Sequence, residues 1–236
     1  MRLILAAITM ATALAAPVIV WAQSQPVVVE LYTSQGCSSC PPADALLADL
    51  ANRPDVIALA LHVDYWDYIG WADGFADPAF TLRQKGYAKA AGHRTIYTPQ
   101  MIIGGRDHLV GAKPMELSDL ISAHARQPVT ARLAARRDGS KLVVTAERNG
   151  AAQLPTNMVL QVVRFDPMRS VEIRSGENAG KTISYANIVT SWSQVAKWDG
   201  QNPLRAAIEV GGKASPLAII LQAAGNGPIV AAAQVR

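Results

Sequence analysis

The sequence has little cysteine, little charge and few aromatic residues. Its 236 residues include two cysteines, 17% charged residues and 6% aromatic residues. Two cysteines can form one disulfide, and they cannot supply the four thiolates of a cysteine-only zinc site. The formal net charge of +4 is a mild excess without a lysine or arginine run, so it favours neither nucleic acid nor an anionic membrane surface as a partner. Half of the residues are hydrophobic, which is enough to bury a core.

One long apolar stretch is present, and it lies at the N-terminus. Residues Leu3 to Val20 follow a positive charge at Arg2, and Val20-Trp21-Ala22 offers a site that a signal peptidase tolerates. These features predict a signal peptide over residues 1–22. A stretch of this length can also span a bilayer as an uncleaved anchor, and this alternative stays open. With cleavage, we expect a periplasmic or secreted protein without stable membrane insertion.

The two cysteines, Cys37 and Cys40, are separated by only two residues. In an oxidising compartment, paired cysteines usually form disulfides. Because a disulfide stabilises a fold mainly by closing a long loop, a bridge between these two cysteines adds little stability. The pair is therefore a poor structural link and a good candidate for a redox-active disulfide.

Residues 26–126 alternate strand and helix patterns, which predicts an α/β domain. Between residues 41 and 52, apolar side chains recur at helical spacing and leave Asp44 and Asp49 on the other side of the helix. Gly104-Gly105 predicts a tight hairpin turn. The expected strands are 26–32, 55–63, 101–103 and 108–110, and the expected helices are 41–52, 78–91 and one that includes 117–124.

A different pattern begins after Gln127-Pro128, which we take as the domain boundary. Residues 128–236 contain about eight short alternating strands and no helical pattern, and this indicates an all-β, sandwich-like C-terminal domain. Residues 158–165 and 170–174 are expected as two separate strands. The polar loop from Arg174 to Lys181 could face the redox cleft and select a partner.

The expected position of Cys37 and Cys40 carries the chemistry. They lie where the first strand ends and the first helix begins, so the unpaired N–H groups and the dipole of the helix can stabilise a thiolate. We expect Cys37 to attack a partner and Cys40 to resolve the mixed disulfide. Half of a zinc site has the same spacing, so a metal-binding or metallochaperone protein using Cys37, Cys40 and His62 for zinc or Cu(I) is the alternative.

Thr98-Pro99 stands at the start of the third expected strand, where proline cannot donate to the sheet. Together with the preceding order of elements and the cysteine pair, it resembles the thioredoxin fold over residues 26–126. The resemblance implies that the peptide bond before Pro99 is cis, that Pro99 packs beside the cysteines, and that the backbone of Thr98 pairs with a bound peptide. The serines between the cysteines and Gly36 before them depart from ordinary thioredoxins.

Four motifs carry a closer resemblance. They are Glu30-Leu-Tyr-Thr-Ser-Gln-Gly-Cys-Ser-Ser-Cys-Pro-Pro-Ala-Asp44, His62-Val-Asp-Tyr-Trp-Asp67, Tyr97-Thr-Pro-Gln100 and Gly176-Glu-Asn-Ala-Gly-Lys181. Together they resemble the motifs of the DUF1223 family, whose members are bacterial secreted proteins with a thioredoxin-like domain and no settled function.

Other residues support these predictions, each with an alternative. Glu30 lies in the apolar strand that leads to Cys37, where a buried carboxylate could accept the proton of Cys40, or it could be an edge or salt-bridge residue. His62 ends the neighbouring strand and could lower a thiol pKa, or it could be structural. Tyr65 and Trp66 could line a substrate groove or form the contact to the second domain.

The favoured hypothesis is an exported thiol–disulfide oxidoreductase. It acts on a protein or small-thiol partner through Cys37 and Cys40, and it needs no cofactor. Two other classes stay open, the metal-binding protein described above and a non-catalytic interaction module in which Cys37→Ser changes nothing measurable.

Overall fold

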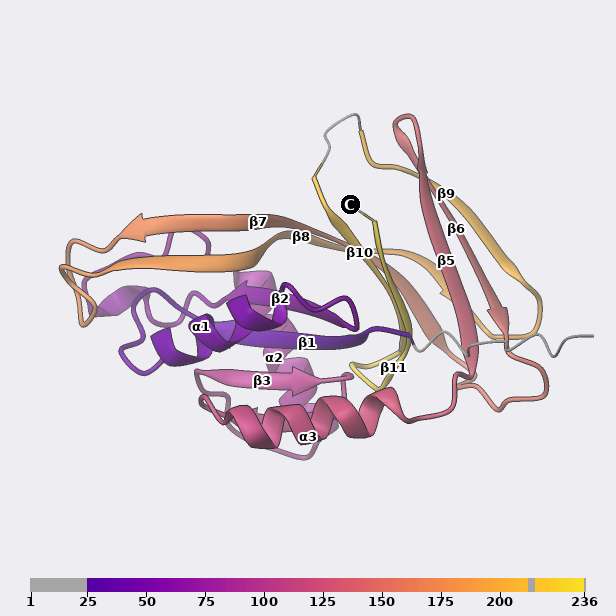
Figure 1. Cartoon of the computed structure of the whole chain (residues 1–236), viewed down its shortest axis with the longest axis horizontal. Helices are drawn as coiled ribbons and strands as arrows, with labels where there is room; N and C mark the ends of the chain where they lie inside the picture. The colour runs from indigo at the N-terminus through magenta and orange to yellow at the C-terminus, as the bar shows by residue number, and fades with distance from the viewer. Residues whose placement is uncertain (1–24, 212–214, 236) are drawn as a thin grey trace, which may run out of the picture.

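The computed structural model describes residues 25–211 and 215–235. The predicted signal peptide, residues 1–22, lies outside these ranges. Within them, no helix has the length and apolar character needed to cross a membrane. The fold is mixed α/β, with one large mixed sheet and a second, smaller sheet (Figure 1).

The large sheet has eight strands in the order β11-β10-β7-β8-β2-β1-β3-β4, and the small sheet has three in the order β5-β6-β9. β1 pairs in parallel with β2 and antiparallel with β3. In chain order the elements are β1 (Val27–Thr33), α1 (Pro41–Leu50), β2 (Val56–His62), a 3-10 turn (Asp67–Ile69), α2 (Pro78–Ala90), β3 (Gln100–Ile103), β4 (Asp107–Val110), α3 (Pro114–Ala125), β5 (Ala131–Asp138), β6 (Lys141–Arg148), β7 (Met158–Glu172), β8 (Thr182–Trp198), β9 (Leu204–Glu209), β10 (Leu217–Ala223) and β11 (Ile229–Val235).

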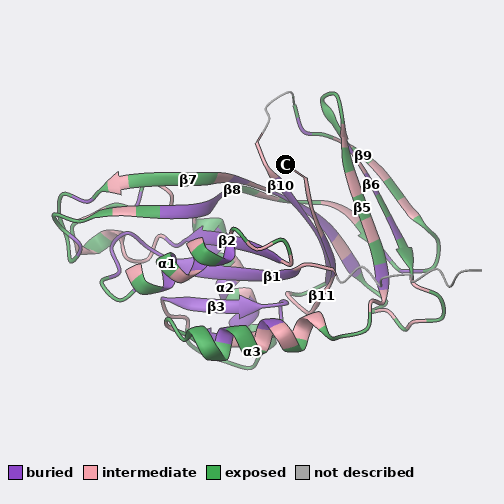
Figure 2. Ribbon diagram, viewed as in Figure 1, coloured by how far each residue is buried: buried purple, intermediate pink, exposed green. Residues whose placement is uncertain are grey.

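β1 and β2 are buried along their whole length, as their continuous apolar sequences predict for strands covered on both faces (Figure 2). On one face of β1, Val28 and Tyr32 pack with Phe80 and Tyr87 of α2. The other face packs against α1 and α3. Successive residues of a strand point to opposite faces, so β1 separates two different cores.

The C-terminal strands are arranged differently from the predicted separate sandwich. Residues 158–172 form one long strand, β7, instead of two. β7 pairs with another long strand, β8, and β8 pairs in parallel with β2 through Ala60 and Ile188. As a result, β7, β8, β10 and β11 extend the first sheet. The order of strands in a sheet depends on long-range pairing, which the alternation of short apolar runs does not specify.

The small sheet packs face to face with C-terminal strands of the large sheet, in a sandwich-like arrangement. Leu142 and Val144 of β6 share an apolar cluster with Leu160 of β7 and Ile219 of β10. The small sheet therefore packs on the end of the large sheet that lies away from α1 and α3 (Figure 1). The predicted boundary at residues 127–128 falls in the connection between α3 and β5. The division into two domains stays a prediction.

Candidate functional site

Cys37 and Cys40 form a disulfide at the N-terminus of α1, with their Cα atoms 5.4 Å apart. Two turns build the segment, because the N–H of Cys37 donates to Ser34 and that of Cys40 donates to Cys37. Cys40 is the residue that precedes α1, and the helix then opens with two prolines, whose missing N–H groups cost little there. Both cysteines are buried, although Ser38 and Ser39 between them are exposed.

The surroundings of Cys37 suit a thiolate. The dipole of the α1 N-terminus favours a negative charge there, although Pro41 and Pro42 supply no N–H groups and the N–H of Cys40 is bonded to the Cys37 carbonyl. The hydroxyl of Ser39 also lies 3.4 Å from Cys37 Sγ, within reach of a weak hydrogen bond to sulfur. When the disulfide opens, Cys37 is therefore placed to leave or attack as a thiolate.

The loop between β7 and β8 contacts residues 34–40, which hold the cysteine pair and are called the redox segment after their predicted role. Asn178 is buried, and its side-chain amide donates to the carbonyl oxygens of Gln35 and Cys37, both at 2.9 Å. Lys181 donates to the side-chain oxygen of Asn178 at 2.8 Å, which fixes the orientation of the amide. Nearby, Ser175 donates to the carbonyl of Gly70. The contact of this loop with the redox segment is thus a feature of the fold, and a role in partner choice stays a prediction.

The peptide bond between Thr98 and Pro99 is cis. Trp66 connects this bond to the redox segment, because its indole N–H donates to the Thr98 hydroxyl at 2.7 Å, and a Cβ on Gly36 would lie 3.4 Å from Trp66 Cβ. Tyr65, predicted beside it, donates instead to Gln84 of α2. Trp66 therefore lies between Thr98 and Gly36, the residue before Cys37, and the packing of Pro99 beside the cysteines stays a prediction.

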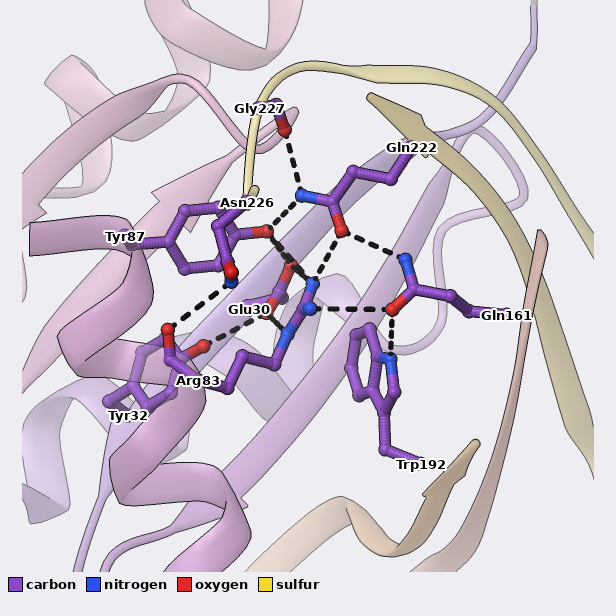
Figure 3. Close-up of polar contacts among 9 residues, drawn as sticks. All are labelled: Glu30, Tyr32, Arg83, Tyr87, Gln161, Trp192, Gln222, Asn226 and Gly227. Carbon is purple, nitrogen blue, oxygen red and sulfur yellow. Dashed lines mark hydrogen bonds and ion pairs between the residues drawn. The ribbon is translucent and has the colours of Figure 1, made fainter. Parts of the chain in front are cut away.

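Glu30 lies on the α2 face of β1 in a buried polar network (Figure 3). Arg83 binds both of its oxygens, at 2.7 and 2.8 Å, and the hydroxyls of Tyr87 and Tyr32 donate to it at 2.6 and 3.1 Å. Burial raises the pKa of Tyr87, which keeps its proton on the oxygen. α1 packs on the opposite face, because strand alternation sends Glu30 and Leu31 to different sides.

The same network joins α2 to the C-terminal strands. Arg83 contacts Gln222 of β10 and Gln161 of β7, and its guanidinium lies 3.7 Å from the ring centre of Trp192 on β8. Trp192 donates in turn to Gln161. The salt bridge of Glu30 was one of the sequence alternatives, but no local pattern indicated the whole network, because its members come from five separate elements.

His62 is fully buried at the end of β2, next to Thr33 in the strand register. Its Nδ1 lies 2.7 Å from a carboxylate oxygen of Asp73, and that same oxygen accepts the N–H of Gln35 at 2.8 Å. A carboxylate can only accept, so the proton of this hydrogen bond belongs to Nδ1 of His62. The pair of His62 and Asp73 is thus bonded directly to the segment that leads into Cys37.

Asp44 is buried, contrary to the expectation from the sequence. Helical spacing placed it on the outer side of α1, but its exposed fraction is 3%, whereas Asp49 is exposed as predicted. The reason is that α1 packs against β8 as well as against β1 and β2. Burial raises the pKa of Asp44 to about 7, against the opposing influence of His62 and of the Thr33 hydroxyl. The available signal was its position four residues after Cys40, on the same side of the helix.

Within residues 25–211 and 215–235, no three histidine, cysteine or acidic side chains are grouped so that they could hold a metal ion. The ligand set that the sequence offered as an alternative was Cys37, Cys40 and His62. In this structure the two sulfurs are bonded to each other, and one nitrogen of His62 faces Asp73.

The family described as "protein of unknown function (DUF1223)" matches residues 28–222, which span both sheets and the redox segment. The chain belongs to the DUF1223 family. The family resemblance seen in the four sequence motifs is confirmed. No curated protein matches the sequence.

Two solved structures are similar to this DUF1223 protein. A crystal structure of a protein from Agrobacterium tumefaciens is 33% identical, covers 91% of this chain and 96% of its own, and has a TM-score of 0.78. HBP35 of Porphyromonas gingivalis is 16% identical, covers 90% of this chain and 75% of its own, and has a TM-score of 0.63. The second similarity concerns the fold alone.

Proposed function

We propose that this DUF1223 protein is an exported thiol–disulfide oxidoreductase that works through Cys37 and Cys40. The disulfide at the N-terminus of α1 carries the proposal. It closes a loop too short to stabilise the fold appreciably, and it stands where a thiolate is favoured. A CxxC disulfide is compatible with a redox role, and its position is what makes that role the best-supported function.

The N-terminal part is proposed to be a thioredoxin-like unit. The order β1-α1-β2-α2-β3-β4-α3, with a cis bond before Pro99 at the start of β3, supports this. In such a unit, Pro99 and Thr98 would border the docking groove next to the cysteines. The aromatic side chain of Trp66, bonded to Thr98, would form part of its wall.

The chemistry needs only a partner disulfide or thiol. The thiolate of Cys37 attacks a partner disulfide, one partner sulfur leaves as a thiolate, and a mixed disulfide forms. The thiolate of Cys40 then attacks Cys37 Sγ, which releases the second partner sulfur and forms the Cys37–Cys40 bond. The partner is reduced by two electrons and the protein is oxidised by two, and the direction reverses when the partner is a dithiol.

The partner is proposed to be a protein or small-molecule thiol outside the cytoplasm. Support for export comes from the sequence of residues 1–22, which the structure does not describe. Cys37 is 1% exposed, and Asn178 of the loop 174–181 is bonded to its backbone carbonyl, so we expect this loop to shift before a protein reacts with the sulfur. A small thiol needs a smaller opening.

Redox equilibration tests this function directly. The purified protein is incubated in graded glutathione or dithiothreitol buffers, the free thiols are alkylated, and the mass is measured. We expect one two-electron transition that is absent in Cys37→Ser. A potential near about −120 mV indicates a disulfide donor, and one near about −270 mV indicates a reductant. A protein that shows no transition in any buffer is not an oxidoreductase, and metal titration of its thiols becomes the next experiment.

A further inference from the structure

Unpartnered polar groups gather where β1 and β2 end and α1 begins. Among the residues that the structure describes, the buried side-chain nitrogens and oxygens without a hydrogen-bond partner belong to four side chains, namely Thr33, both oxygens of Asp44, Nε2 of His62 and the hydroxyl of Tyr185. Most buried polar atoms in proteins are hydrogen-bonded, and each exception calls for an explanation.

These side chains come from four elements but are neighbours in space. Thr33 of β1 stands beside His62 of β2 in the strand register, and the rings of His62 and Tyr185 of β8 have centres 4.9 Å apart. The charges of Asp44 and Asp73 both raise the pKa of Tyr185, whose largest cause of elevation is burial. Asp73 completes the set through its bond to His62.

Asp44 is the member that lies on the same helix turn as Cys40. It lies four residues after Cys40, and its backbone N–H donates to the Cys40 carbonyl at 3.1 Å. In a helix, side chains at positions i and i+4 share a face, with Cβ atoms about 5–6 Å apart. Helical side chains also lean towards the N-terminus, so the carboxyl group of Asp44 leans over the turn that holds Cys40.

We propose that Asp44 is the proton acceptor and donor for Cys40, and that the pair of His62 and Asp73 positions and tunes it. The proposal rests on the proposed function, since it assigns a role within the same thiol–disulfide exchange. It replaces Glu30, the carboxylate that the sequence suggested, because both oxygens of Glu30 are bound to Arg83 on the other face of β1.

In the proposed reaction, a proton transfer accompanies cleavage of the Cys37–Cys40 bond. A partner thiolate attacks Cys37 Sγ, the Cys37–Cys40 bond breaks, and Cys40 leaves with the electron pair. The carboxylic acid of Asp44 gives its proton to that sulfur, which leaves a Cys40 thiol and an Asp44 carboxylate. In the reverse direction the carboxylate takes the proton back, and the Cys40 thiolate attacks the mixed disulfide and expels the partner thiolate.

Burial explains why the carboxyl group of Asp44 can exchange a proton with a thiol near neutral pH. An ordinary aspartate is too weak a base for a thiol, whereas burial brings the pKa of Asp44 to about 7, close to a working pH. The groups around it are the Thr33 hydroxyl from β1, His62 from β2, Asp73 from the segment before α2 and the Tyr185 hydroxyl from β8. The charge of His62 lowers the pKa of Asp44 and so opposes the effect of burial.

The test is the rate at which dithiothreitol reduces the Cys37–Cys40 disulfide between pH 5 and pH 9, divided by the concentration of dithiothreitol thiolate. If Asp44 supplies the proton, this corrected rate falls about tenfold from pH 6 to pH 8, because the acid form is lost around pH 7. In Asp44→Asn the corrected rate is low and independent of pH. Asp49→Asn, on the exposed side of the same helix, keeps the wild-type profile.

Two further measurements separate the possible failures. The carboxyl carbon shift of Asp44, followed by NMR, should titrate near pH 7 in the disulfide form and at a different pH in the dithiol form, because the Cys40 proton couples to it. His62→Asn should move the rate profile to higher pH. If the protein equilibrates with thiols but wild type and Asp44→Asn have the same corrected profile, the role of Asp44 is wrong and the oxidoreductase stands. If no variant exchanges, the proposed function itself fails.

Discussion

The two faces of β1 hold two buried polar clusters that differ in one respect. On the α2 face, Glu30 and Arg83 meet with every strong donor and acceptor occupied (Figure 3). On the α1 face, Asp44 and the Nε2 of His62 are buried without partners. A satisfied network fixes one arrangement of the fold, whereas unsatisfied groups cost free energy and persist where they have another use. We therefore infer that the first cluster stabilises the fold and that the second takes part in the chemistry.

Breaking the satisfied cluster should have the largest effect on stability. Arg83→Met leaves the fully buried Glu30 without its cation, and we expect a loss of about 3–5 kcal/mol in the free energy of unfolding. Urea unfolding with the disulfide intact measures it. Lys85→Met, at an exposed position of the same helix, is the control and should change stability by less than about 0.5 kcal/mol.

The same variant also checks the division of roles. Where Arg83→Met still folds at low temperature, its redox potential and its pH profile of disulfide reduction should match those of the wild type. A shift of the pH profile in this variant, comparable with that of Asp44→Asn, would show that the two clusters are not separate.

The unsatisfied cluster should make stability depend on pH. The pKa of Asp44 is about 7 in the folded protein and about 3.8 when unfolded, so between these values the native state holds a proton that the unfolded state has lost. Stability therefore falls as pH rises from about 4 to about 7, by up to about 4 kcal/mol from this group. Asp44→Asn lacks this term, so its unfolding free energy should fall less over that range. Urea unfolding at several pH values measures the slope, and parallel curves for the two proteins would contradict the assignment.

The sequence predicted the parts of this molecule that depend on local pattern. The strands and helices of residues 26–126 and the cysteine pair at a helix N-terminus follow from short motifs, and the family resemblance implied the cis bond before Pro99. The position of Asp44 could not be predicted, because helical spacing says which residues share a side but not that β8, more than a hundred residues later, packs against the same helix.

The place of the C-terminal strands was missed for the same reason. Pairing between Ala60 and Ile188 joins β8 to β2 across a long separation in the chain, and this pairing creates both polar clusters. The network around Arg83 needs Gln161 and Gln222, and the cluster around His62 needs Tyr185. Sites built between distant elements leave no local pattern to read.

A substitution of Asn178 should have the smallest effect of these variants. Asn178 contacts the backbone of the redox segment and not the titrating groups of either polar cluster. Asn178→Asp keeps an acceptor for Lys181 but cannot donate to the carbonyls of Gln35 and Cys37. Loss of two hydrogen bonds, about 1–2 kcal/mol, should loosen the cover over Cys37 and speed reduction by dithiothreitol about tenfold at every pH. Glu177→Gln, exposed in the same loop, should leave the rate unchanged. An unchanged rate in Asn178→Asp would mean that this loop does not limit access to the disulfide.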